Sequence, residues 1–149
     1  MPRTPSEVFL AVVEGVGDRR YDELPDLYAE HTDVRHPMAP GGAPVLRTRD
    51  DLRRHFGAAA KRLPTVEFRP ADITVHQTTD PEVIVAEFSY RGTKLATGEA
   101  FTVPAVFVVR VRDGEIVESR DYFDHLAFAQ ARGDLPETLA RLTPTPADT

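Results

Sequence analysis

The chain has 149 residues, 41% hydrophobic and 28% charged, which favours one globular domain with a sizeable core. Its net charge of −6 and the lack of a basic run argue against a nucleic-acid partner or an anionic membrane surface. Because the chain has no cysteine, disulfides, thiolate metal sites and cysteine nucleophiles are excluded.

Targeting and membrane signals are not recognisable in the sequence. No apolar stretch approaches the roughly 18 residues that a membrane span needs, and the opening Met-Pro-Arg-Thr-Pro lacks the apolar core of a signal peptide. We therefore expect a cytoplasmic protein without a membrane partner. We also expect a single domain over residues 1–142 and a disordered tail over 143–149.

The first half of the chain carries helical signals. Thr4-Pro5-Ser6-Glu7 reads as a capping box with proline at the first helical position, and apolar residues then recur at helical spacing up to Gly17. A second, short helix is predicted from one apolar face made of Tyr21, Leu24, Leu27 and Tyr28. After a short strand over 33–38 and a turn-rich run, a third helix is predicted to open at Thr48 as N-cap.

The second half carries strand signals. Four strands are predicted, at approximately 65–78, 82–91, 99–112 and 115–123, with Asp113-Gly114 as a hairpin turn. A last helix follows, with Asp124 as its N-cap and Gly133 just beyond its end. Helices followed by an antiparallel meander predict an α+β fold: a cone-shaped α+β barrel, with N-terminal helices packed on a curved antiparallel sheet around a pocket.

Side-chain alternation predicts which residues enter this cone. In the third predicted strand the apolar face is Phe101, Val103, Ala105, Phe107 and Val109. In the fourth, one face is Val117, Ser119, Asp121 and Phe123, and the charged face is Ile116, Glu118, Arg120 and Tyr122. Asp121 is therefore predicted to lie on an apolar wall, where lost hydration raises a carboxyl pKa and makes it a useful proton carrier. The alternative is a buried carboxylate that only satisfies a backbone N–H or an arginine.

Two further side chains are candidates for the same pocket. Tyr90 shares the predicted inner face of Ile84, Ala86 and Phe88, where it could orient a substrate oxygen or simply fill the core. His36 could reach the pocket mouth as a second acid–base group, or be an ordinary satisfied or exposed histidine. His31 and Asp33 are assigned to a turn, and their spacing with His36 gives no convergence on one point, so no metal site is predicted.

The stretch Gly114-Glu-Ile-Val-Glu-Ser-Arg-Asp-Tyr-Phe-Asp124, after three helices and a meander, resembles the SnoaL-like branch of the NTF2-like, or ketosteroid-isomerase-like, superfamily. The resemblance covers roughly residues 5–133. Members include polyketide cyclases, limonene-type epoxide hydrolases and ketosteroid isomerases. In the cyclases and epoxide hydrolases the aspartate that matches Asp121 is the acid–base residue on the inner wall of the cone, so the resemblance implies a catalytic Asp121.

The chain also departs from these patterns. Limonene-type epoxide hydrolases carry an Arg-x-Asp pair on the strand that matches residues 82–91, where this chain has Phe88 and Tyr90. Phe88 cannot support the water-activating network, which weakens an epoxide hydrolase interpretation. The oxyanion donors of ketosteroid isomerases, whose protonated carboxylic acid is a known case of pKa tuning, have no convincing counterpart.

The resemblance favours a small cofactor-free enzyme that uses Asp121 as general acid or base on an apolar, oxygenated small molecule, either an aldol-type cyclase or an isomerase of secondary metabolism. Tyr90 and His36 would assist. The substrate-binding residues are predicted to be Tyr28, Phe88, Val103, Ala105, Phe107, Ser119 and Phe123. Two alternatives remain open: an epoxide hydrolase or epoxide-opening cyclase, and a non-catalytic binder of hydrophobic molecules. A homodimer is predicted through the outer sheet face, formed by Val106, Val108, Ile116 and Tyr122.

Overall fold

A computed structural model of the protein describes residues 1–143, so residues 144–149 of the predicted tail lie outside the described residues. The elements, in chain order, are α1 (Pro5–Gly17), the 3₁₀ turn η1 (Leu24–Leu27), β1 (Tyr28–Arg35), β2 (Leu46–Thr48), α2 (Arg49–Arg62), β3 (Val66–Gln77), β4 (Val83–Lys94), β5 (Ala100–Arg112), β6 (Glu115–Phe123), α3 (His125–Arg132) and α4 (Leu135–Leu142).

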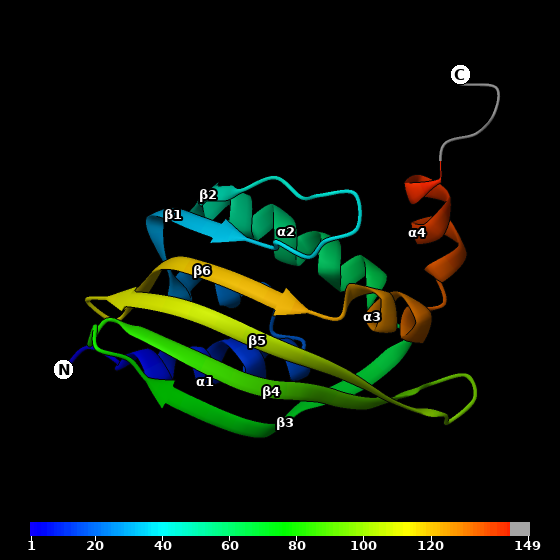
Figure 1. The fold of residues 1–149 in the computed structure, drawn as a ribbon, viewed down its shortest axis with the longest axis horizontal. Helices are drawn as coiled ribbons and strands as arrows, with labels where there is room; N and C mark the ends of the chain where they lie inside the picture. Colours follow the sequence, from blue (N-terminus) through cyan, green and yellow to red (C-terminus); the bar gives the residue numbers. More distant parts are fainter. Residues whose placement is uncertain (144–149) are drawn as a thin grey trace.

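The strands form one curved six-stranded sheet in the order β2-β1-β6-β5-β4-β3. All neighbouring strands are antiparallel except β1 and β6, which run parallel. In Figure 1, α1 lies behind β4 and β5, on the concave side of the sheet. The predicted α+β fold, with N-terminal helices on a mostly antiparallel sheet, is confirmed.

Helix boundaries follow the predicted caps. The Thr4 hydroxyl accepts from the Glu7 N–H at 3.2 Å while the Glu7 carboxylate accepts from the Thr4 N–H at 3.3 Å, which completes the capping box of α1. Thr48 caps α2 by accepting from the Asp51 N–H at 3.1 Å. Gly133 ends α3 with a φ of 86°, a left-handed conformation that glycine adopts without strain. Helix α4 was not predicted from the sequence.

The predicted second helix is wrong. Only one 3₁₀ turn forms, and Tyr28 begins β1, which also contains His31 and Asp33 instead of leaving them in a turn. Strand β1 pairs with β6 on one side and β2 on the other. Those ladder hydrogen bonds come from residues far along the chain, and they outweigh a short helical periodicity.

The four predicted strands of the second half are confirmed to within a few residues, apart from one reversal of faces. Ile116, predicted to point outward, is 2% exposed in the core. In the β5–β6 ladder Arg110 pairs with Glu118 and Val111 with Ile116, so Val117 is an extra residue. This β-bulge shifts the alternation by one residue, and it leaves Ser119 and Asp121 on the inner face.

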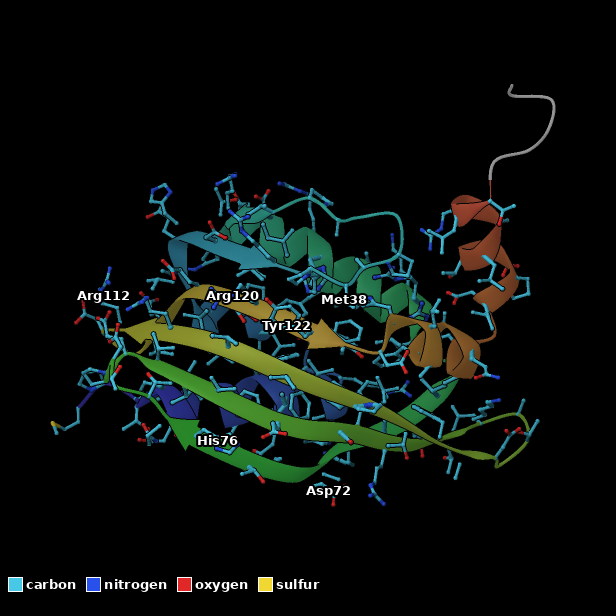
Figure 2. The ribbon with its side chains drawn as sticks, in the orientation of Figure 1. Met38, Asp72, His76, Arg112, Arg120 and Tyr122 are labelled. Atoms are coloured by element: carbon cyan, nitrogen blue, oxygen red, sulfur yellow. The ribbon has the colours of Figure 1, made fainter. Side chains whose placement is uncertain are left out.

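The outer edge of the sheet is interrupted at Asp72 in β3. Pairing with β4 shifts register between Ala71 and Thr74, and Asp72 has a φ of 56°. Figure 2 shows Asp72 at the edge of the sheet. Its carboxylate pairs with Arg91 of β4 at 2.7 Å. The edge strand therefore consists of two ladders joined by a bend.

The core beneath the site is aromatic. Phe9 of α1 meets the rings of Phe88 and Phe107 edge-on, with centroids 5.3 and 6.1 Å away, and those two rings lie 5.0 Å apart. Edge-to-face pairs of this kind add about 0.5–1.5 kcal/mol each to the burial of their surface. The cluster fixes α1 against the middle of the sheet, on the same inner face as Asp121.

Gly92 in β4 lies where the sheet has no room for a side chain. A Cβ there would come 1.9 Å from the Glu67 carbonyl oxygen and 2.6 Å from the Phe68 Cβ. Gly92→Ala is expected to lower the free energy of unfolding by about 1–3 kcal/mol, because β3 must move away. Urea unfolding of the variant and the parent protein measures this loss. Gly57→Ala is the control: that position in α2 is open, so the variant should gain about 0.5–1 kcal/mol. Equal stabilities for the two variants would contradict the packing argument.

Candidate active site

A cavity of about 340 Å³ lies between the inner face of the sheet, α2, α3 and the segment that joins β1 to β2. This volume is at the lower end of the roughly 300–1,000 Å³ that small-molecule sites span. Most of its wall is apolar, with Phe56 and Leu63 from the α2 side and Phe107 and Phe123 from the sheet. Several polar side chains project from this wall into the cavity.

Asp121 is the buried carboxyl group of the cavity. It lies on the inner face of β6 and is 7% exposed. Burial raises the pKa of Asp121, and the neighbouring His36 and the Ser119 hydroxyl, which donates to Asp121 Oδ1, offset the rise in part. A proton is therefore held more readily here than by an aspartate in water.

His36 lies opposite Asp121. It follows the end of β1, its side chain is 10% exposed, and its Nε2 is 3.6 Å from Asp121 Oδ2. The distance is too long for a strong hydrogen bond but short enough for one charge to act on the other. The structure thus brings together two residues that are 85 positions apart in the sequence.

Tyrosine hydroxyls add to the polar groups of the cavity. Tyr28 at the start of β1 and Tyr90 in β4 both line the cavity and are 3% and 5% exposed. Burial raises the pKa of both phenols, and the nearby Asp121 raises it further. Both hydroxyls therefore keep their protons at neutral pH, and each can donate a hydrogen bond to an oxygen in the cavity.

Two histidines that the sequence did not single out also line the cavity. His55 of α2 stacks on His36 with ring centroids 4.9 Å apart, and His125 of α3 stacks on Phe123 at 3.8 Å. Burial, and then the charge of His36, lower the pKa of His55 to about 4 and that of His125 to about 4. Both rings are therefore neutral at neutral pH.

The other predicted binding residues divide into two groups. Tyr28, Phe107 and Phe123 line the cavity. Ser119 is buried behind Asp121 and bonds to it, whereas Phe88, Val103 and Ala105 are buried in the core and are not among the lining residues. Asp124 acts as the N-cap of α3, accepting from the Ala127 N–H at 2.9 Å.

Metal-binding groups are not assembled in the described part of the chain. Within residues 1–143, no three His, Cys, Asp or Glu residues come close enough together to hold a metal ion. His31 lies exposed in β1, away from the cavity that contains His36. No helix among the same residues is long and apolar enough to cross a membrane.

The outer face of the sheet has a second, wider hollow of about 790 Å³. Its lining residues include Met38, Val106, Tyr122 and Leu126. Figure 2 shows Tyr122 and Arg120 on this outer side, whereas Asp121, between them in β6, is buried on the inner face. Of the four residues predicted to form a dimer interface, Ile116 is wrong because it belongs to the core, and dimerisation through the remaining three stays a prediction.

Comparison with known proteins gives one family. A family model described as a SnoaL-like domain matches residues 9–119. An uncharacterized PhzA/B-like protein of Pseudomonas aeruginosa is 30% identical over 111 residues, which cover 72% of this chain and 75% of the relative. The uncharacterized protein YesE of Bacillus subtilis is 28% identical over 109 residues, covering 72% and 73%.

Solved structures share the fold at low sequence identity. A protein of Bacillus subtilis provisionally described as an isomerase superposes with a TM-score of 0.75 at 22% identity, covering 87% of this chain and 93% of its own. A provisionally described polyketide cyclase of Pseudomonas putida superposes with a TM-score of 0.65 at 19% sequence identity, covering 87% of this chain and 98% of its own. TerC, co-crystallized with polyporic acid, gives 0.65 at 20%, again covering 87% and 98%.

Proposed function

Because the chain belongs to the SnoaL-like domain family of the NTF2-like superfamily, we propose that it is a small cofactor-free enzyme in which Asp121 moves a proton on a bound substrate. Its structural neighbours include proteins provisionally described as polyketide cyclases and isomerases. The reaction we propose is an aldol-type cyclisation or an isomerisation of an apolar, oxygenated molecule, in secondary metabolism.

One observation carries this proposal: a buried carboxyl group of raised pKa on the mostly apolar wall of a cavity. A general acid or base is most effective when its pKa lies near the working pH, and burial moves an aspartate in that direction. His36, at 3.6 Å, can stabilise the carboxylate when the proton leaves. The wall offers Asp121 no arginine partner within salt-bridge distance among residues 1–143 that would hold it permanently ionised.

Asp121 and the two tyrosines, Tyr28 and Tyr90, can together catalyse proton transfer at the carbon next to a carbonyl group. The Asp121 carboxylate removes a proton from the carbon beside the carbonyl, and the electron pair of that C–H bond moves onto the carbonyl oxygen. A phenol, from Tyr28 or Tyr90, donates a hydrogen bond to the oxygen as its negative charge grows. In an isomerisation the Asp121 carboxylic acid returns the proton to another carbon. In an aldol cyclisation the enolate carbon instead attacks a second carbonyl, whose oxygen takes the proton.

The test is exchange of carbon-bound hydrogen. A panel of bicyclic ketones, beginning with β-tetralone, is incubated with the protein in deuterium oxide, and loss of the proton signal beside the carbonyl is followed by NMR. Line broadening identifies the ketones that bind. We expect exchange of at least one bound ketone to exceed the buffer rate. Bound ketones that all exchange at the buffer rate would contradict the proposal.

An epoxide-opening reaction is the second candidate. It is supported by the same raised pKa, since a protonated Asp121 could donate to an epoxide oxygen with Tyr90 assisting. Phe88 and Tyr90 in place of an Arg-x-Asp pair count against water activation. A non-catalytic binder is the third candidate, and it predicts ligand affinity without exchange or ring opening.

A further inference from the structure

Three arginines line the cavity from three different helices. Arg62 ends α2, Arg132 ends α3, and Arg141 lies in the last turn of α4. Figure 1 shows the carboxyl-terminal end of α2 running toward α3 and α4 at one end of the molecule. A protein with a net charge of −6 thus gathers three guanidinium groups around one cavity.

The positive charge of this arginine cluster is only partly neutralised. Arg132 uses its Nε and Nη2 on the two carboxylate oxygens of Asp134, at 3.1 and 3.2 Å. Arg141 donates to the Thr138 hydroxyl at 3.4 Å, a neutral partner. Arg62 has no carboxylate within 4.0 Å and no hydrogen-bond acceptor among residues 1–143. Arg62 is exposed at the rim of the cavity, yet its partial desolvation and the neighbouring Arg132 and Arg141 lower its pKa, and Asp134 offsets this only in part.

The cluster lies next to the proposed acid–base group. The charge of Arg62 reaches both His55 and His125, whose pKa values it helps to lower. His55 stacks on His36, and His36 lies 3.6 Å from Asp121. The arginines and Asp121 thus line the same cavity, where one small molecule can contact both.

The ordinary explanation of such arginines is the helix dipole. A cation in the last turn of a helix faces partly negative carbonyl groups, which is worth a few tenths of a kcal/mol to about 1 kcal/mol at an exposed site. This accounts for each arginine with its own helix. It does not account for three side chains from three separate helices that line one cavity, two of which lower the pKa of the third, Arg62.

We propose that the arginine cluster binds a carboxylate of the substrate. A guanidinium group pairs with a carboxylate through two parallel hydrogen bonds, and Arg62 is the member with its donors uncommitted. This inference rests on the proposed function and assigns a substrate class to it. The substrate is an apolar carbonyl compound with one carboxylate; the carbon beside its carbonyl lies at Asp121, and its carboxylate lies at the arginine cluster.

A matched ligand pair tests this assignment. β-Tetralone bearing a carboxylate on its aromatic ring is compared with the corresponding methyl ester, by titration of both into the protein. We expect the acid to bind about tenfold or more tightly than the ester, and its affinity to fall with added salt. Arg62→Gln should reduce the preference to near equality, whereas Arg62→Lys should retain part of it.

Arg53→Gln is the control, because it removes the same charge from the same helix at a position that is exposed like Arg62 but pairs with Asp50 and does not line the cavity. It should keep the preference for the acid. Equal binding of acid and ester by the unmodified protein, or an unchanged preference in Arg62→Gln, would overturn the proposal. Deuterium exchange on both ligands separates the two hypotheses: exchange without acid preference contradicts only the arginine site, and acid preference without exchange contradicts only the proton transfer.

Discussion

Asp121→Asn is expected to slow protein-catalysed deuterium exchange of a bound ketone by about 10²- to 10⁴-fold, the usual contribution of a general acid or base. Asparagine has nearly the same shape and can still accept the Ser119 hydrogen bond, but it cannot take or give the proton. Exchange rates measured by NMR at saturating ketone give the loss directly. Ketone affinity should change little, because the apolar walls remain.

Asp124→Asn, the same substitution three residues later in the chain, is the matched control. Asp124 caps α3 and is not among the residues that line the cavity. Asparagine is also a good N-cap, so Asp124→Asn should keep both the helix and the exchange rate. Loss of exchange in Asp124→Asn, or its survival in Asp121→Asn, would contradict the assignment of the two aspartates.

Asp121→Asn should also change how stability depends on pH. Because the folded-state pKa of Asp121 is raised, its contribution to stability is fully present below the unfolded-state pKa, about 3.9, and is lost as the pH rises through the folded-state value. At neutral pH the asparagine variant should therefore gain stability relative to the parent protein. The gain should shrink as the pH falls toward 4.

Acid should destabilise the protein through His55 and His125. Their folded-state pKa values of about 4 lie below the ordinary value of 6.5. The stability that comes from keeping them neutral is present above pH 6.5 and is lost as the pH falls through 4. For His55, the more buried of the two, the shift corresponds to on the order of 3 kcal/mol. Urea unfolding at pH 7 and pH 4 measures the fall.

His55→Gln should remove much of this dependence, because glutamine does not titrate in the range. The difference in unfolding free energy between pH 7 and pH 4 should shrink by about 2–3 kcal/mol. His31→Gln is the control, since His31 is exposed on β1 and takes no part in the stacked rings. A His55→Gln variant with the acid sensitivity of the parent would show that the buried ring is not its source.

The sequence predicts the position of Asp121 because the relevant signal is local. Apolar residues alternate along β5 and the end of β6, so a period of two places Asp121 with Phe123 on the inner side. The same rule fails at Ile116, only five residues earlier, because the bulge at Val117 shifts the period. Whether a strand accommodates an extra residue depends on its partner, and the partner lies outside the local pattern.

The rest of the site depends on contacts between distant segments. His55 follows Arg53 and Arg54 in the sequence, so the run looks like an exposed helix face. Only the packing of α2 against the end of β1 brings it onto His36. Arg62, Arg132 and Arg141 likewise line one cavity only because the ends of α2, α3 and α4 pack together. The sequence pattern predicts a helix at Tyr28 because the parallel pairing of β1 with β6 has no sequence signal of its own.

The bend at Asp72 has a consequence for how copies of the protein meet in a crowded solution. A long, straight, unpaired strand edge is a template on which another chain can add a strand, and this is how fibrillar aggregates begin. Here the ladder of β3 breaks after Ala71 and resumes at Thr74, with a charged pair at the break. An incoming strand would have to follow the same bend to stay in register. Edge-to-edge growth from β3 is therefore disfavoured, although no strand among residues 1–143 pairs with it on that side.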